Sequence, residues 1–172
     1  MRKIITTTFV TADGVMQAPG GPEEDRSGGF AYGGWMFPYG DSVTDAVLKE
    51  FVSLPFEMLL GKRTYDIFAA YWPHADPDSF VTKPFNSTRK YVVSHHPAKL
   101  RWNNSILITG DVVAELCKLK EQDGPDLWVH GSGNLIQTLL ESHLIDVMHV
   151  WTFPVTVGSG PPDPNGIVRA GI

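Results

Sequence analysis

The sequence predicts an α/β domain with a central, mostly parallel β-sheet and helices on both faces. Strand-like apolar runs alternate with amphipathic stretches of about 10 to 12 residues, the pattern of βα units. Two of these runs lead directly through glycine into a helix, Met58–Leu60 into Gly61 and Leu127–Val129 into Gly131. The chain has 172 residues, of which 42% are hydrophobic, so it suffices for one core and is too short for two typical domains. A single domain over residues 1–172 follows.

The expected elements follow one another without a repeat or a low-complexity block. Strands are expected at 3–10, 57–61, 90–94, 105–109, 126–130 and 146–157, and helices at 42–53, 63–71, 111–122 and 133–142. Asp111 predicts the N-cap of the third helix, which Gly124-Pro125 ends. The region 11–40 stays irregular, and loops of such length in compact domains often serve as functional lids.

Composition excludes several classes of protein. A net charge of −5 without a basic run argues against nucleic acid as a partner. No stretch approaches the ~20 apolar residues of a membrane span, so a cytoplasmic protein is expected. The single Cys117 permits no internal disulfide, and its helical surroundings predict a buried packing thiol. The six histidines have no metal-binding spacing, and no metal site is expected.

The two glycine junctions are the strongest functional signal. Glycine lets the backbone approach a ligand closely, and the first turn of a helix offers unpaired N–H groups to an anion. A pair of such junctions can therefore hold the pyrophosphate of a dinucleotide. The alternative is that the glycines serve packing alone, since βα turns need glycine anyway. A Rossmann fold is the structural runner-up, but Gly131-Ser132-Gly133 lacks the third glycine of that motif.

An ordered series of motifs over residues 1–160 resembles one known group of proteins. The motifs are Gly61-Lys62-Arg63-Thr64-Tyr65, Lys90-Tyr91-Val92-Val93-Ser94, Trp102-Asn103-Asn104-Ser105, Gly131-Ser132-Gly133 with Leu135, Leu144-Ile145-Asp146, and Phe153-Pro154-Val155-Thr156-Val157-Gly158-Ser159-Gly160. In this order they resemble the dihydrofolate reductase-like superfamily. Within it, the chain is similar to the reductase domain of bacterial riboflavin biosynthesis proteins.

The resemblance implies a dihydrofolate reductase-like three-layer fold and NADPH as the cofactor. The glycine junctions, Gly61 to Thr64 and Gly131-Ser132-Gly133, would hold the pyrophosphate. For the 2′-phosphate, the cationic or hydroxyl candidates at two strand ends are Lys62, Arg63, Ser94 and His95. The implied substrate is a small pyrimidine or pterin-like heterocycle, with 5-amino-6-(5-phosphoribosylamino)uracil reduction as the named candidate. The competing interpretation is a non-catalytic member of the fold that binds a nucleotide or another ligand.

Three further residues are candidates for the chemistry, Asp45 as the catalytic residue and Asp13 and Trp35 as substrate residues. Asp45 stands sixteen positions before Gly61, where dihydrofolate reductases carry the carboxylate that orients the pterin and assists protonation. A helix macrodipole alone also favours an acidic residue there. Asp13 and Trp35 lie in the loop that the family closes over substrate and nicotinamide. Turn chemistry remains the alternative for Asp13, and core packing for Trp35.

The end of the chain departs from the family pattern. Residues 161–172 are too short and too rich in proline and glycine to supply the two strands with which the family normally completes its sheet. An incomplete sheet exposes the backbone of an edge strand, either the one expected at 146–157 or its neighbour. A homodimer that covers this edge is therefore expected, as the resembled family commonly dimerises.

Overall fold

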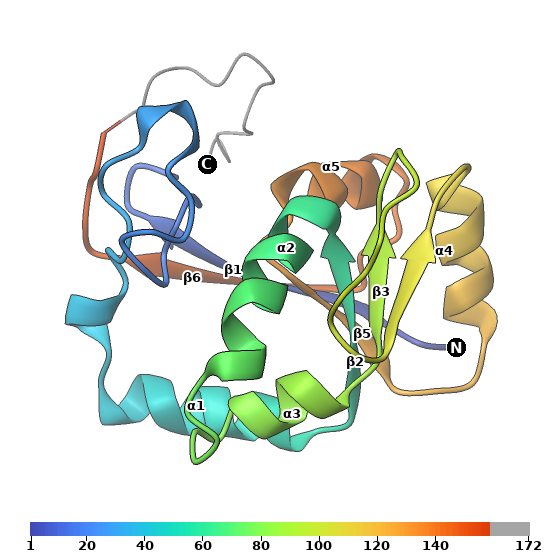
Figure 1. Ribbon diagram of the computed structural model, residues 1–172, viewed down its shortest axis with the longest axis horizontal. Helices are drawn as coiled ribbons and strands as arrows, with labels where there is room; N and C mark the ends of the chain where they lie inside the picture. Colours follow the sequence, from blue (N-terminus) through green and yellow to red (C-terminus); the bar gives the residue numbers. More distant parts are fainter. Residues whose placement is uncertain (159–172) are drawn as a thin grey trace.

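The computed structural model describes residues 1–158 and confirms the α/β prediction (Figure 1). Its six strands form one sheet in the order β4-β3-β2-β5-β1-β6, and each of the five neighbouring pairs is parallel. The strands are β1 Ile4–Thr11, β2 Phe56–Gly61, β3 Lys90–Val93, β4 Ser105–Ile108, β5 Asp126–His130 and β6 Val147–Phe153. The predicted tail, 161–172, lies outside the described residues.

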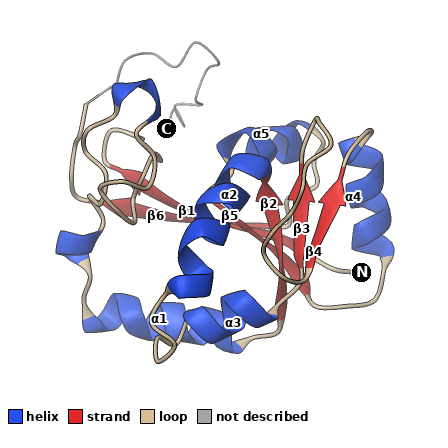
Figure 2. Ribbon diagram, in the orientation of Figure 1, coloured by secondary structure: helices blue, strands red, loops and turns tan. Residues whose placement is uncertain are grey.

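Helices cover both faces of this sheet, which gives the expected three layers (Figure 2). The helices are α1 Ser42–Ser53, α2 Lys62–Tyr71, α3 Thr82–Ser87, α4 Val112–Glu121 and α5 Gly133–Glu141, with short 3-10 turns at Ser27–Gly29, Phe37–Tyr39 and Trp72–His74. One face packs against α4 and α5 through leucines such as Leu116 and Leu139. The other packs against α1, α2 and α3 through aromatic side chains such as Phe51, Tyr65 and Phe85.

Local sequence signals explain where several elements begin and end. Asp111 accepts a hydrogen bond from the amide of Ala114 at 3.0 Å, so it caps α4 as predicted. Strand β6 ends at Phe153, earlier than expected, because Pro154 has no N–H to donate to a ladder. Helix α3 was not expected, since a six-residue helix with Pro84 in its first turn has little periodicity.

The buried environment predicted for Cys117 is wrong, because this residue is exposed on α4.

The irregular region 11–40 forms a lobe of its own on the β1 and β6 side of the sheet (Figure 1). A small core holds it there, built from Ala18, Phe30, Trp35 and Phe153 of β6. Trp35 and Phe153 meet edge to face, with ring centroids 5.5 Å apart. The loop is therefore packed against the sheet, with its other side toward the start of α2.

Candidate functional site

The candidate site lies where the order of the strands reverses. Strands β2 and β5 are neighbours, with Met58 beside Trp128, although some 65 residues separate them in the chain. Helix α2 leaves β2 toward one face of the sheet, and α5 leaves β5 toward the other. In open parallel sheets, a crevice for ligands forms at the carboxyl ends of two such strands. Both predicted glycine junctions lie at this point.

Hydrogen bonds join the two junctions directly. The amide of Gly61 donates to the hydroxyl oxygen of Ser132 at 3.0 Å. The amide of Ser132 donates to the hydroxyl oxygen of Thr64 at 3.1 Å, and the Ser132 hydroxyl donates to the carbonyl of His130 at 2.8 Å. The structure thus brings together the glycine-junction residues predicted from the sequence, and the Thr64 hydroxyl already serves as a bridge between them.

The backbone at the second junction is specialised. Gly131 has φ +50°, a conformation that side chains rarely adopt, and a Cβ there would lie 3.5 Å from the Thr64 side chain. Ser132 also has a positive φ, 56°, although it is not glycine. Strained backbone of this kind persists where surrounding contacts hold it, as the Thr64 and Gly61 hydrogen bonds do here, and it concentrates at functional sites.

The helices at the crevice differ from the others in how they begin. Helices α1 and α4 each start with an aspartate whose carboxylate accepts a backbone N–H, and each has an acidic residue in its first turn. Helices α2 and α5 have neither feature. Instead, α2 begins with Lys62 and Arg63, which the positive end of the helix dipole disfavours. Uncapped amides together with two cations are the environment that an anion requires.

Each of the two basic residues is paired with an aspartate. Lys62 pairs with Asp66 one turn further along α2, 2.6 Å apart. Arg63 reaches Asp25 of the 11–40 loop at 2.6 Å and also contacts the Ser27 hydroxyl. Burial acts to raise the pKa of Asp25, but the hydrogen bonds from Ser27 and the Arg63 guanidinium outweigh it and leave that pKa below its usual value. The loop is therefore tied electrostatically to the start of α2.

Ser94 and His95 follow β3, whose Val93 lies beside Gly61 of β2, so they share the same edge of the sheet. The Ser94 hydroxyl is engaged with the backbone of His96, donating to its carbonyl at 2.9 Å. His95 is exposed. Among the described residues no hydrogen bond joins either of them to the glycine junctions, and a role toward a 2′-phosphate stays a prediction for both.

The predicted catalytic residue Asp45 and the predicted substrate residues Asp13 and Trp35 occupy different environments. Asp13 accepts hydrogen bonds from the Thr11 hydroxyl at 2.5 Å and from the Gly158 amide at 2.8 Å, which together hold its pKa below the usual value. Trp35 is buried, and its indole N–H donates to the carbonyl of Gln17 at 2.8 Å. Asp45 is exposed in the first turn of α1. The described contacts of Asp13 and Trp35 are those of a turn and a core, and their contact with substrate stays a prediction.

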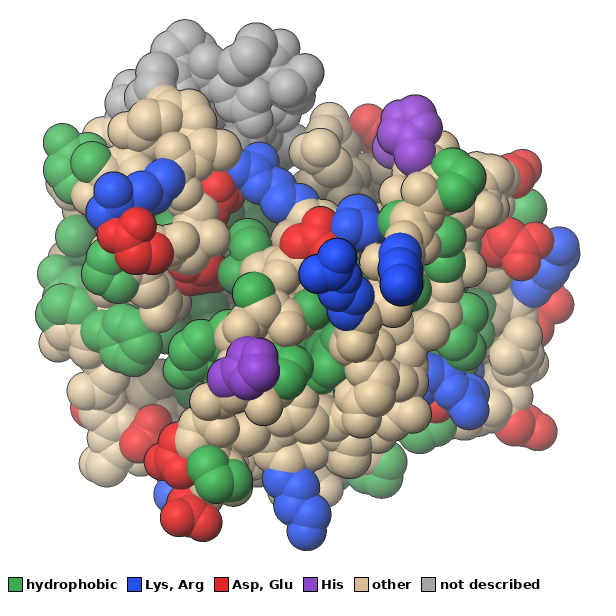
Figure 3. Space-filling model, viewed as in Figure 1, with side chains coloured by type: hydrophobic (Ala, Val, Ile, Leu, Met, Phe, Trp, Pro, Cys, Tyr) green, Lys and Arg blue, Asp and Glu red, His purple; other side chains and the backbone are tan. Residues whose placement is uncertain are grey.

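The surface between the loop lobe and α2 is hollowed and lined by hydrophobic side chains, with basic and acidic side chains at its upper rim (Figure 3). Met16 brings the loop to this region, since its Cε lies 4.0 Å from the position of a Cβ on Gly133. The loop, the start of α2 and the start of α5 therefore meet at one place. A ligand at the glycine junctions would be flanked by this loop.

His130 belongs to this site and was not among the residues predicted from the sequence. It ends β5 directly before Gly131, and its Nε2 atom is buried without a hydrogen-bond partner. Burial lowers its pKa from 6.5 to about 4. The position of a histidine immediately before the glycine turn is the signal that could have indicated it.

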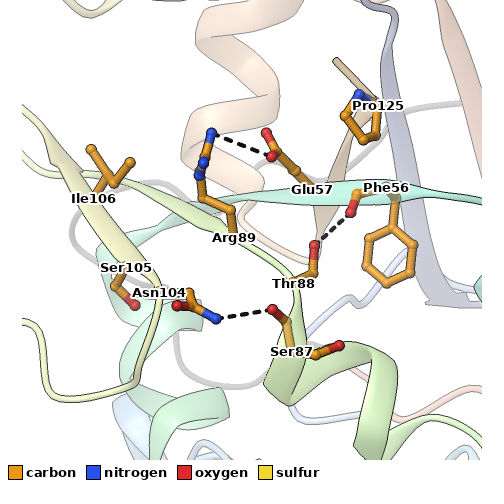
Figure 4. Close-up of a pocket in the computed structure, with 9 residues that line it drawn as sticks. All are labelled: Phe56, Glu57, Ser87, Thr88, Arg89, Asn104, Ser105, Ile106 and Pro125. Atoms are coloured by element: carbon orange, nitrogen blue, oxygen red, sulfur yellow. Dashed lines mark hydrogen bonds and ion pairs between the residues drawn. The ribbon is translucent and has the colours of Figure 1, made fainter.

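A separate depression of about 540 Å³ lies at the other end of the sheet (Figure 4). It is formed around the beginnings of β2, β3 and β4, by residues such as Glu57, Arg89 and Ser105. Arg89 approaches Glu57 at 3.5 Å, and the Thr88 hydroxyl donates to the carbonyl of Phe56. Its polar groups are thus largely paired with one another, and it is not part of the glycine-junction site.

Within residues 1–158, no three histidine, cysteine or acidic side chains gather as a potential metal site. Over the same residues, none of the helices combines the length and apolarity needed to cross a bilayer.

Comparisons with known proteins agree with the fold. The chain is 29% identical over 166 residues to the uncharacterized protein YyaP of Bacillus subtilis (strain 168), covering 94% of this chain and 79% of that protein. It is 24% identical over 105 residues to the uncharacterized protein YwjB of the same strain, covering 61% and 56%. In structure it is similar to a dihydrofolate reductase from Enterococcus faecalis complexed with NADP(H) and RAB-propyl, with a TM-score of 0.54, 13% identity and coverage of 94% and 77%. Residues 2–168 match the family model of the RibD C-terminal domain, and the chain belongs to this family.

Proposed function

We propose that this protein is an NADPH-dependent reductase of a small heterocycle of the pyrimidine or pterin type. The observation that carries the proposal is the pair of uncapped, non-acidic helix starts, α2 and α5, which meet at the strand-order reversal. Membership of the RibD C-terminal domain family and the similarity to an NADP(H)-complexed dihydrofolate reductase support it. A cytoplasmic location is part of the same proposal.

The residues present fit a dinucleotide. The free amides in the first turns of α2 and α5 can receive the pyrophosphate, and Gly61, Gly131 and Gly133 keep side chains away from it. Lys62 and Arg63 supply positive charge beside this position, which favours NADPH over NADH. Ser94 and His95, at the end of the adjacent β3, are proposed to assist them. When bound, NADPH would supply the hydride.

The chain's own groups then have three tasks: to orient the substrate, to exclude water and to provide a proton. The 11–40 loop, held to α2 through Arg63 and Asp25, is suited to excluding water from the crevice. Asp13 and Trp35 shape this loop, and we propose Asp45 as the carboxylate that assists protonation. The riboflavin-pathway substrate 5-amino-6-(5-phosphoribosylamino)uracil is the first candidate within the proposed class.

Hydride transfer tests the proposal directly. Purified protein is mixed with NADPH deuterated at C4 of the nicotinamide and with a panel of pyrimidine and pterin substrates, and NADPH absorbance and deuterium in the product are followed. The proposal expects NADPH oxidation that depends on one of these substrates, together with deuterium transfer. Tight binding of NADPH or a heterocycle without oxidation would identify a non-catalytic, ligand-binding member of the fold instead. Thr64→Val should lower the rate, while the exposed His74→Gln serves as a control.

A further inference from the structure

A row of three polar side chains crosses the sheet beside the glycine junctions. In the register of the parallel strands, Thr7 of β1 lies beside His130 of β5 on one side and beside His149 of β6 on the other. Residues in register on adjacent strands point to the same face, about 4.8 Å apart. Ile5 of β1 packs with the aromatic side chains on the face of the sheet that α1, α2 and α3 cover, and alternation along the strand places Thr7 on that same face. The three side chains therefore lie on the face of the sheet that α1, α2 and α3 cover.

The surroundings of this row are aromatic. The His130 ring lies 5.2 Å from the ring of Phe85 and 6.2 Å from that of Phe68, measured between centroids. At the other end, the His149 ring lies 4.8 Å from Phe51 of α1. A polar row in such a setting is costly unless its groups find partners, because buried polar atoms lose their hydrogen bonds to water.

His130 has a buried ring nitrogen of this kind, without a hydrogen-bond partner in the described part of the chain. Its Nε2 is sealed from solvent and has no partner among the described residues, although the residue as a whole is partly exposed. Burial keeps the imidazole neutral, with a pKa of about 4. A neutral imidazole has one N–H donor and one acceptor nitrogen. Because the faces of aromatic rings are negative, an N–H directed among them is favoured over a lone pair.

This environment selects a tautomer. With Nε2 sealed from solvent and protonated among the rings, Nδ1 is left as the acceptor nitrogen for a ligand. We propose that His130 is a substrate-recognition residue whose Nδ1 accepts a hydrogen bond from a ring N–H of the heterocycle, so that the site selects lactam-type rings and rejects their N-alkylated counterparts. The inference rests on the proposed reductase function and specifies the substrate class of the same site.

A matched pair of probes tests this inference. The probes are 5,6-diaminouracil and 5,6-diamino-1,3-dimethyluracil, which share a ring and differ in whether the ring nitrogens carry hydrogen or methyl. Imidazole nitrogens of ¹⁵N-labelled protein are followed by NMR in the presence of NADPH. We expect His130 to be neutral with Nε2 protonated, its Nδ1 resonance to shift when 5,6-diaminouracil is added, and the dimethyl probe to bind about tenfold more weakly or worse.

Two variants separate recognition from folding. His130→Phe keeps an aromatic ring but removes the acceptor, so it should bind NADPH as the wild type does and lose the discrimination between the probes. His130→Gln retains an acceptor and should keep part of that discrimination, while the exposed His74→Gln should behave as the wild type. An Nδ1-protonated tautomer, equal affinity of the wild type for both probes, or no binding of either would overturn the inference. Discrimination without NADPH oxidation by any heterocycle would instead overturn the reductase activity alone.

Discussion

The amide of Ser132 donates a hydrogen bond to the hydroxyl oxygen of Thr64, 3.1 Å away. This contact joins the turn after β5 to the first turn of α2, and it involves a serine held at positive φ. The Thr64 side chain also packs at the position where Gly131 lacks one. Thr64 therefore positions both helix starts at once, which is a wider role than direct contact with a pyrophosphate.

Replacing Thr64 tests whether this joint supports the cofactor. Thr64→Val keeps the shape of the side chain and leaves the Ser132 amide without its acceptor, so NADPH binding should weaken by about 1 to 3 kcal/mol while the fold stays intact. Thr64→Ser retains the hydroxyl and should bind nearly as the wild type does. Calorimetric titration measures the NADPH affinity of both variants. Unchanged affinity in the Val variant would remove this junction from the cofactor site.

Lys62 and Arg63 are expected to distinguish the two nicotinamide cofactors. If either contacts the 2′-phosphate, its replacement by Ala should weaken NADPH more than NADH, because only NADPH carries the extra charge. Arg63→Ala also breaks the pair with Asp25, so Asp25→Asn serves as its control for loop effects. Calorimetric titration of each variant with NADPH and with NADH measures the two losses of affinity. Equal losses would indicate general electrostatics, and no loss would make both residues part of a solvated helix face.

Replacing Asp45 tests whether its carboxylate assists protonation of the substrate. Asp45→Asn should keep NADPH affinity and lower turnover by about 10² or more, with a changed pH profile, if the carboxylate assists protonation. A carboxylate that only stabilises the helix terminus would cost at most about 1 kcal/mol of stability and leave turnover unchanged. Asp41→Ala is a matched control, because Asp41 caps the same helix through the Thr44 amide at 2.7 Å. Turnover against pH and thermal unfolding separate these outcomes.

The edge of the sheet leads to a prediction about assembly. In the described part of the chain β6 is an edge strand, and Met148 and Val150 on it are 43% and 52% exposed. Exposed apolar edges pair readily with other chains, so we predict a homodimer through β6. Light scattering should report a dimer, and Val150→Lys should convert it to a monomer. Ile106→Lys, on the opposite edge strand β4, should leave the dimer unchanged. A monodisperse wild-type monomer would contradict the prediction.

Lys90 predicts how stability changes with pH. Its side chain is fully buried, with Nζ 2.8 Å from the carbonyl of Asn86 and 4.2 Å from the Trp102 ring centroid, and burial lowers its pKa from 10.5 to about 8. Between these two values the unfolded chain holds a proton that the folded protein lacks, so the free energy of unfolding rises with pH there. The rise should be at most about 3 kcal/mol.

Denaturant unfolding at about pH 7 and about pH 10 measures this contribution of Lys90. Because other groups titrate alike in both proteins, the difference between wild type and Lys90→Met isolates the lysine, and the variant should show a smaller rise. An identical rise of the unfolding free energy in the two proteins would contradict a lowered pKa of Lys90 in the folded state.

Several features could be predicted because they depend on neighbouring residues. The pattern of a strand, a glycine turn and a helix start around Gly61 and Gly131 is local, and so is the N-cap at Asp111. Helix α3 was missed because it has six residues and a proline, too few for a periodic pattern. The exposure of Cys117 was missed because a helical pattern does not state which face meets solvent.

The sequence by itself determined the class of fold, the positions of both glycine junctions and the resemblance from which NADPH is proposed, since each depends on short motifs in the chain. Tertiary structure alone decided that the two junctions share Ser132, that Arg63 reaches Asp25 of the loop, and that His130 lies in register with Thr7. Such contacts join residues tens to more than a hundred positions apart. They arise from strand order and the packing of side chains in a common core, which no local window of sequence contains.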